Sequence, residues 1–249
     1  MSLQGKVAVV TGGASGIGHS ICLRLARDGA DVAVLDVNHA GAQQTVAAIE
    51  RLGRRALAVT ADVSAAAAVA DAFAAVRAGL GCIHILVNDA GICAYEAFQG
   101  MSEAVWDRMI AVHVKGAFHC VRAALPDMRA AGWGRIVNLS SVAGLNGGGA
   151  GLVHYATAKG AIIGFTKSLA REVGPSGITV NAIAPGLIET PMIHGAGVPA
   201  TLIQQLADES PVRRVGVPDD IAAACAYLVS PEASFVTGQV ISPNGGSYI

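Results

Sequence analysis

The sequence is poor in charge and contains no long apolar run. Only 14% of its 249 residues are charged, and the formal net charge is −1. No basic excess is available to attract a nucleic acid or an acidic membrane surface, so we expect neither as a partner. No apolar stretch reaches the roughly 18 residues that a membrane-spanning helix needs. The apolar run after Lys6 is too short for the core of a signal peptide.

Cysteine is also scarce, and its spacing carries no motif. The chain contains no C-x-x-C pair, and its five cysteines are Cys22, Cys82, Cys93, Cys120 and Cys225. This odd, scattered set lacks metal-ligand spacing, so we expect no metal site and interpret the cysteines as small buried hydrophobic residues. A reducing cytoplasmic location fits the pattern best.

Short β-branched runs alternate with helical patterns along the whole chain. Strands are expected at 6–12, 31–36, 55–62, 84–91, 135–141 and 178–186. Helices are expected at 17–28, 40–52, 64–78, 102–131 and 155–173. This alternation predicts βαβ units, and strands that are apolar on both faces predict helices on each side of the sheet. We therefore predict one Rossmann-like α/β domain over residues 1–249, a doubly wound parallel sheet of about seven strands.

A glycine-rich segment, TGGASGIG at residues 11–18, follows the first expected strand and opens a helix. The start of a helix at the carboxyl end of a parallel strand presents unpaired N–H groups and a positive dipole to a pyrophosphate. The strand before it and the helix after it make this glycine pattern specific for a dinucleotide. The candidate cofactor-binding residues in this loop are Gly12, Ser15, Gly16, Ile17 and Gly18.

Asp36 ends the second expected strand, 18 residues beyond Gly18. A carboxylate there can accept hydrogen bonds from the two hydroxyls of an adenosine ribose, and it would repel a 2′-phosphate. Its neighbours Val37 and Asn38 supply no cation to offset this repulsion. We therefore predict NAD rather than NADP as the cofactor.

The glycine spacing and four other motifs resemble the short-chain dehydrogenase/reductase family over residues 5–246. TGGASGIG is similar to the family's TGxxxGxG, NDAG at 88–91 to its NNAG, and YATAK at 155–159 to its YxxxK. DV at 62–63 is similar to its adenine contact, and PGLIET at 185–190 to the loop that holds the nicotinamide carboxamide. The resemblance implies further cofactor contacts from Asp62, Val63, Asn88, Ala90, Gly91, Tyr155, Lys159, Pro185, Gly186, Ile188 and Thr190.

Tyr155 and Lys159 are spaced to share one face of a helix. Hydride transfer between an alcohol and a nicotinamide needs a group that takes or returns the hydroxyl proton. A phenol with a pKa near 10 is weakly ionised at neutral pH, and a neighbouring ammonium would lower that pKa. We predict Tyr155 as the acid/base, Lys159 as its electrostatic partner, and Ser141 as the donor that positions the substrate oxygen. Ser140 is the alternative to Ser141.

Three residues depart from the family pattern or adjoin its core motif. VHVKG places His113 where the family often has an Asn that holds a helix kink and a proton relay, so His113 is a further candidate catalytic residue. Asp89 replaces the second Asn of NNAG, and a hydrogen bond to a neighbouring strand is expected to be missing or rearranged. His154 is expected at a rim or interface, because successive helix residues point about 100° apart.

The loops after the fourth, fifth and sixth strands are largely apolar and contain neither Arg nor Lys. They favour an apolar secondary alcohol or ketone, and residues 187–210 are expected to form a substrate lid. A 3-oxoacyl thioester of CoA or a carrier protein remains an alternative, with the Arg213–Arg214 pair as a possible contact for its charged arm. A non-catalytic NAD-binding sensor or scaffold is a second alternative. The resemblance also implies a homotetramer.

Overall fold

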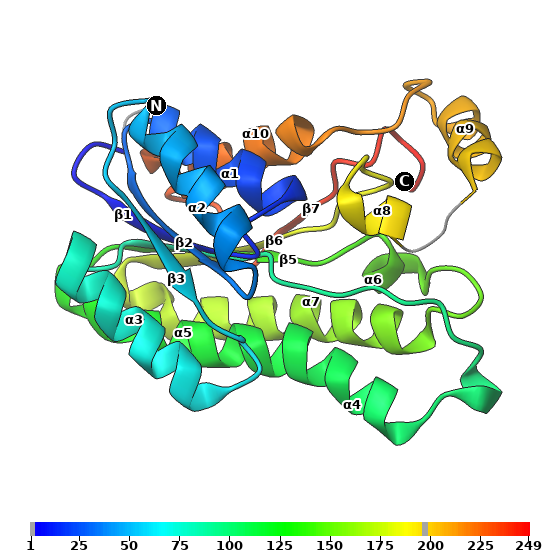
Figure 1. The fold of residues 1–249 in the computed structure, drawn as a ribbon, viewed down its shortest axis with the longest axis horizontal. Helices are drawn as coiled ribbons and strands as arrows, with labels where there is room; N and C mark the ends of the chain where they lie inside the picture. The colour runs from blue at the N-terminus through cyan, green and yellow to red at the C-terminus, as the bar shows by residue number, and fades with distance from the viewer. Residues whose placement is uncertain (1–2, 196–198) are drawn as a thin grey trace.

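The computed structural model describes residues 3–195 and 199–249. In this part of the chain, seven parallel strands form one sheet in the order β3-β2-β1-β4-β5-β6-β7 (Figure 1). The strands are β1 (Val7–Thr11), β2 (Asp31–Asp36), β3 (Ala56–Thr60), β4 (Ile85–Asn88), β5 (Gly134–Leu139), β6 (Ile178–Ile183) and β7 (Val240–Ile241). The predicted doubly wound α/β fold is confirmed, and only β7 falls where the sequence predicted no strand.

Helices cover both faces of the sheet (Figure 1). One layer consists of α1 (Gly16–Arg27), α2 (His39–Glu50) and α10 (Pro218–Val229). The other consists of α3 (Ala66–Leu80), α4 (Glu103–Ile110), α5 (Gly116–Ala131) and α7 (Val153–Val173). Successive side chains of a strand point to opposite faces. Ala8 and Val10 therefore pack in the hydrophobic core under α1, α2 and α10. Val7 and Val9 pack in the core under α3, α5 and α7.

The helix predicted at 102–131 is interrupted. Ser102 caps α4 by accepting a hydrogen bond from the backbone N–H of Val105 at 3.3 Å. A π-helical segment, Ala111–Lys115, then separates α4 from α5. Such one-turn bulges are rare and often occur at functional sites. Here it carries His113, so the expected kink lies where the sequence departs from the family.

The order of the strands creates a crevice at their carboxyl ends. The chain runs outward from β1 to β3 and then crosses back to β4 on the other side of β1. Loops at such a switch point diverge and leave room for a ligand. The short helices α6 (Ala143–Asn146), α8 (Pro191–Gly195) and α9 (Ala200–Glu209) lie around this end (Figure 1).

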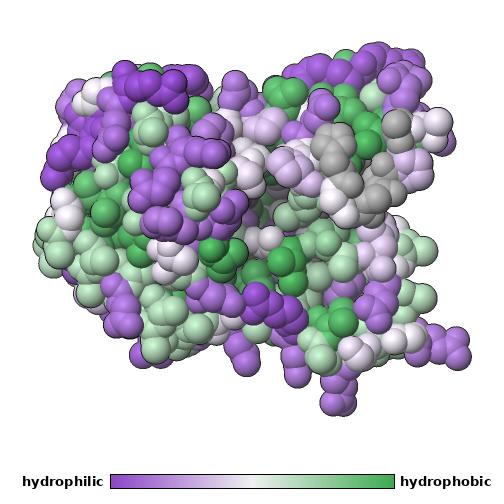
Figure 2. Space-filling view, in the orientation of Figure 1, coloured by the Kyte–Doolittle hydropathy of each residue, from purple (hydrophilic) through white to green (hydrophobic). Residues whose placement is uncertain are grey.

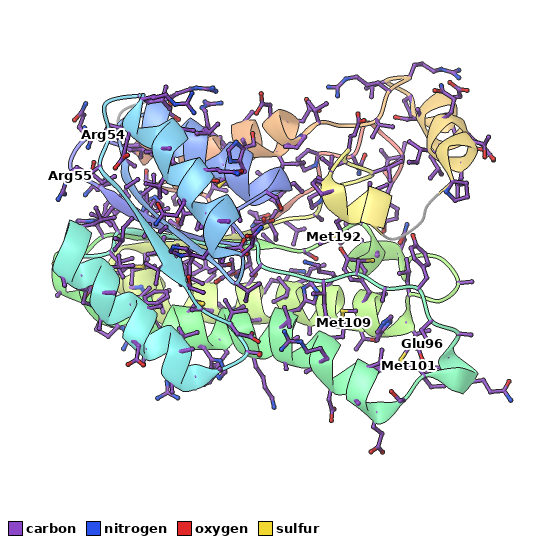
Figure 3. All side chains as sticks on the ribbon, viewed as in Figure 1. Arg54, Arg55, Glu96, Met101, Met109 and Met192 are labelled. Atoms are coloured by element: carbon purple, nitrogen blue, oxygen red, sulfur yellow. The ribbon has the colours of Figure 1, made fainter. Side chains whose placement is uncertain are left out.

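A charged cluster closes the opposite end of the sheet. Asp31 forms ion pairs with Arg54 at 2.6 Å and with Arg55 at 2.7 Å. Figure 3 shows both arginines at the far end of the molecule from Met192 on α8. This cluster joins the starts of β2 and β3, so its role is structural. Among the described helices, none is long and apolar enough to cross a membrane.

Candidate active site

A cleft of about 270 Å³ lies at the switch point between β1 and β4. Figure 2 shows a hollow in this region with hydrophobic residues beside polar ones. The predicted cofactor residues that line it are Gly12, Ser15, Gly16, Ile17, Asp36, Asp62, Val63, Ala90, Gly91 and Thr190. Met192 from α8 borders it as well. The cleft therefore brings together residues that are far apart in sequence.

The glycine loop is packed so closely that side chains would not fit. Gly12 has a φ of +72°, and a Cβ there would lie 2.9 Å from backbone atoms of Ala90. A Cβ on Gly18 would lie 2.3 Å from the carbonyl oxygen of Gly12. The loop can therefore turn tightly from β1 into α1 and leave the helix N-terminus facing the cleft. This cradle of backbone N–H groups fits a pyrophosphate.

Two carboxylates lie at the end of the cleft where the sequence predicts the adenosine of a dinucleotide. Asp36 accepts hydrogen bonds from the backbone N–H of Ala14 at 3.0 Å and of Asn38 at 2.9 Å. Asp62 accepts from the guanidinium of Arg108 at 3.0 Å. Arg108 lines the same cleft from α4 and was not predicted, because its distance in sequence from the other motifs gave no signal.

The remaining predicted cofactor residues lie behind the cleft surface. The side-chain amide of Asn88 donates to Asn138 on β5 at 2.8 Å. The carbonyl of Pro185 accepts from Val142 at 3.0 Å, and Gly186 packs against Asn244. Ile188 is buried. These residues support the loops of the site.

Ser141, Tyr155 and Lys159 come together at the ends of β5 and α7. The Ser141 hydroxyl lies close enough to the Tyr155 phenol to lower its pKa by hydrogen bonding. The Lys159 ammonium lies 5.6 Å from the centre of the Tyr155 ring and donates to the carbonyl of Leu139 at 2.7 Å. Ser140 is buried and donates to the backbone carbonyl of Lys159 at 2.8 Å. The geometry therefore favours Ser141 over Ser140 as the substrate-facing hydroxyl.

Burial dominates the protonation state of the phenol. Burial raises the pKa of Tyr155 above its usual value, and the hydrogen bond from Ser141 offsets only part of this effect. Burial also lowers the pKa of Lys159 to about 8, against the opposing influence of Asp89. The pKa of Tyr155 responds to burial and to Cys93, Ser141, Asp89 and Tyr95, and its predicted lowering by Lys159 stays a prediction. In the protein alone, Tyr155 is a proton donor.

His113 packs directly against the phenol. Its ring meets the Tyr155 ring edge-on, with 5.7 Å between centroids and 86° between planes. Its Nε2 lies 2.8 Å from the carbonyl oxygen and 3.1 Å from the backbone nitrogen of Ile92, so it donates to the carbonyl in one tautomer and accepts from the N–H in the other. Burial first, and the charge of Lys159 second, lower the pKa of His113 to about 3. The imidazole is therefore neutral at physiological pH.

The rearrangement predicted at Asp89 is found, whereas His154 lies where the sequence did not predict it. The interstrand hydrogen bond is made by Asn88, while Asp89 faces α1 and interacts with the backbone N–H of Gly18. The hydrogen bond expected at this position is thus rearranged. The prediction of His154 as a rim residue is wrong, because the side chain is 0% exposed. Helix α7 begins at Val153, so His154 lies in its first turn and acts electrostatically on His113.

Cys93 places a half-buried thiol near the Tyr155 phenol. Cys93 interacts electrostatically with both Tyr155 and Lys159, and burial raises its own pKa. No motif in the sequence predicts a thiol at this place. Exposed apolar side chains lie nearby on the loop after β4 and on α7 and α8, namely Ile92, Tyr95, Phe98, Val153 and Met192.

The lid predicted at 187–210 includes residues 196–198, which lie outside the described residues, and it stays a prediction. No cluster of potential metal ligands occurs among the residues described.

The chain is similar to known proteins over almost its whole length. The family model described as "Enoyl-(Acyl carrier protein) reductase" matches residues 12–247. Subunit BbsD of a hydroxy(phenyl)methylsuccinyl-CoA dehydrogenase from Thauera aromatica is 42% identical over 246 residues, covering 99% of this chain and 98% of the relative. The 3-oxoacyl-acyl-carrier-protein reductase FabG of Staphylococcus aureus is 40% identical over 248 residues, covering 98% of each chain.

A solved structure, that of levodione reductase, superimposes with a TM-score of 0.93 at 33% identity, covering 98% of this chain and 97% of the other. The chain belongs to the short-chain dehydrogenase/reductase family. It is an oxidoreductase, and the members of this family bind nicotinamide cofactors.

Proposed function

We propose that the protein transfers a hydride between NAD(H) and a secondary alcohol or ketone. The single observation that carries this proposal is the contact of Ser141, Tyr155 and Lys159 beside a glycine-loop cleft at the carboxyl ends of the strands. The cleft is lined by the glycine loop and Asp36, as a dinucleotide site requires. The Tyr155 phenol lies near a hydroxyl and an ammonium, as an acid/base residue requires.

Each catalytic side chain has a separate role. A bound nicotinamide dinucleotide would supply or accept the hydride and, when oxidised, a positive charge that lowers the phenol pKa. Tyr155 donates its proton to the ketone oxygen in reduction and takes it back in oxidation. Ser141 donates to the same oxygen and holds it in line. Lys159 provides the one buried ammonium among the described residues, and the family resemblance assigns it to the nicotinamide ribose.

His113 is a positioning residue in this proposal. Its neutral ring holds the backbone of Ile92 and supports the edge of the Tyr155 ring. It fixes the phenol relative to the loop after β4. This role requires neither charge nor a titration near neutral pH.

NAD is favoured over NADP by the surroundings of Asp36. Its carboxylate is held at the end of β2 by two backbone N–H groups. Arg108, the cation that borders the cleft, is paired with Asp62 and Ser64. A 2′-phosphate at Asp36 would therefore meet a fixed negative charge.

A 3-oxoacyl-thioester reductase is the second candidate. It is favoured by the two relatives whose names refer to a CoA compound and an acyl-carrier-protein substrate. The predicted role of the Arg213–Arg214 pair has little support. Arg214 forms two hydrogen bonds to Asp220, and Arg213 donates to the carbonyl of Asp208.

Assembly as a homotetramer in the cytoplasm remains a proposal. Phe118 on α5 and Val153 on α7 are exposed apolar side chains, of the kind that a subunit interface covers. Sedimentation of the purified protein would measure the number of subunits. A non-catalytic NAD-binding role is the remaining alternative, and the assembled catalytic residues weigh against it.

The decisive experiment follows nicotinamide absorbance with NAD(H) and NADP(H) in parallel. Substrates would include acetoacetyl-CoA, aliphatic and cyclic secondary alcohols, and polyols. We expect NADH-linked turnover, and Tyr155→Phe should lower kcat by a factor of about 100 or more, in the range that general acid/base catalysis contributes. Tight NAD binding with no turnover across the panel, and no effect of Tyr155→Phe, would favour the non-catalytic role. The best substrate would separate the two enzymatic candidates.

A further inference from the structure

Asp89 places a carboxyl group directly beneath the glycine loop. A Cβ on Gly18 would lie 2.8 Å from its Oδ2, and the backbone N–H of Gly18 interacts with the carboxylate. Asp89 also lines the cleft in which the dinucleotide is proposed to bind. Asp89 thus lies next to the first turn of α1 and on the cleft where the pyrophosphate is expected.

Among the residues that the structure describes, this carboxyl group has no ion-pair partner. None of the ion pairs found among the described residues includes Asp89. The Lys159 ammonium on α7 favours its ionised form but makes its own hydrogen bond to Leu139. Asp36 at the end of β2 opposes ionisation. Without a paired cation, the charge of Asp89 is costly to hold in this place.

The other titratable groups around Asp89 do not compensate for its charge. Cys22 on α1 and Cys225 on α10 are buried thiols whose pKa values burial raises, and Asp89 adds to that effect. Tyr155 on α7 responds in the same direction, so it stays a neutral phenol. His113, whose ring lies against Gly91, is held neutral by burial. Burial accordingly raises the pKa of Asp89 to about 7.

We propose that Asp89 takes up a proton from solvent when a dinucleotide binds, so that it sets a pH-dependent affinity of this site for the cofactor. The inference rests on the proposed nicotinamide-binding function. A pyrophosphate at the start of α1 brings two negative charges near an unpaired carboxylate and competes with it for the same helix dipole. Both effects favour the neutral acid. An Asn at this position, as in the family's motif, would remove the effect.

The sign of the linkage follows from a pKa that rises on binding. Below the pKa of the free protein, Asp89 is already protonated and binding is at its tightest. As pH rises through that value, each pKa unit by which binding raises the pKa weakens the affinity by up to about tenfold. NADH should show this more strongly than NAD, because the oxidised nicotinamide carries a compensating positive charge.

The test is calorimetric titration of the intact protein with NADH in buffers of different ionisation enthalpy, from about pH 6 to 8. We expect an uptake of about half a proton per site near neutral pH, for a pKa that rises by one unit. Infrared difference spectra on NADH binding should show the C=O stretch of a newly protonated carboxylic acid. This band distinguishes Asp89 from any proton taken up by Lys159.

Two variants identify the source of the proton. Asp89→Asn should lose the infrared band and bind NADH as tightly as the wild type or more so at pH 8. Asp62→Asn is the matched control, because hydrogen bonds from Ser64 and Arg108 outweigh burial and hold the pKa of Asp62 below its usual value. It should keep the band.

The possible failures are distinguishable. A band that persists in Asp89→Asn, or NADH binding without proton uptake across the whole pH range, would overturn this inference and leave the proposed function standing. If the wild-type protein binds no nicotinamide dinucleotide at any of these pH values, the proposed function fails and the inference fails with it.

Discussion

The contact between Gly91 and His113 gives a sharp test of how the phenol is held. A Cβ on Gly91 would lie 2.5 Å from Cε1 of His113, so Gly91→Ala must displace the ring. The ring cannot move freely, because it is hydrogen-bonded to the backbone of Ile92 and packed against the Tyr155 ring. We expect Gly91→Ala to lower the free energy of unfolding by about 1–3 kcal/mol, as overpacking of a core does.

The second half of the cycle removes the ring. His113→Ala loses a hydrogen bond, worth about 1 kcal/mol, and an edge-on aromatic contact, worth about 0.5–1.5 kcal/mol. With the cavity that remains, we expect a loss of about 2–4 kcal/mol. In the double variant the new methyl group enters the space left by the imidazole. The combined loss should therefore be smaller than the sum of the single losses by at least about 1 kcal/mol.

Urea unfolding followed by circular dichroism measures all four proteins of this cycle. Gly100→Ala is the control, since a Cβ there has no neighbour within 4 Å, and it should change stability by no more than about 0.5 kcal/mol. Strictly additive losses for Gly91→Ala and His113→Ala would refute the proposed contact. They would mean that the loop after β4 is positioned independently of the π-helical segment.

Two further substitutions test the cofactor and substrate ends of the site. Asp36→Ala should weaken NADH binding, because ribose hydrogen bonds are lost. It should also reduce the preference for NADH over NADPH by about tenfold or more, because the repulsion of a 2′-phosphate is lost. Unchanged dissociation constants for both cofactors, measured by fluorescence titration, would contradict this role. Ser141→Ala should lower kcat/KM by about 100-fold with little change in stability, whereas Ser140→Ala should lower the free energy of unfolding by about 1–3 kcal/mol through its lost hydrogen bond to Lys159. Steady-state kinetics and urea unfolding of the pair would show whether the two serines have been assigned correctly.

The strands and the cofactor loop were predictable because each has a local signature. Strands buried on both faces read as continuous apolar runs, as in β1 and β2, where every residue except Asp36 is buried. The glycine loop is recognisable because its backbone cannot carry side chains at Gly12 or Gly18. The two residues of β7 gave no such signal, because so short an edge strand is defined by its partner β6.

The features that the sequence did not reveal depend on tertiary surroundings. The π-helical segment has the same apolar periodicity as the helices on either side, so the pattern at 102–131 predicted one helix. His154 was misplaced because its burial depends on which elements pack on the first turn of α7. Arg108 lines the cleft through the tertiary position of α4. Such contacts have no fixed spacing to Tyr155 or to the glycine loop.

The charges of the site explain why its cofactor would have an unusually large electrostatic influence. His113 is neutral, the pKa of Tyr155 is raised, and the pKa of Asp89 is raised to about 7. Lys159 is the buried cation at the centre of this group, and burial lowers its pKa as well. In so weakly charged a site, the positive charge of an oxidised nicotinamide would favour the phenolate that oxidation of an alcohol requires, and its loss on reduction would restore the proton-donating phenol. The direction of proton transfer at Tyr155 would then follow the redox state of the cofactor, without any further titrating residue in contact with the substrate.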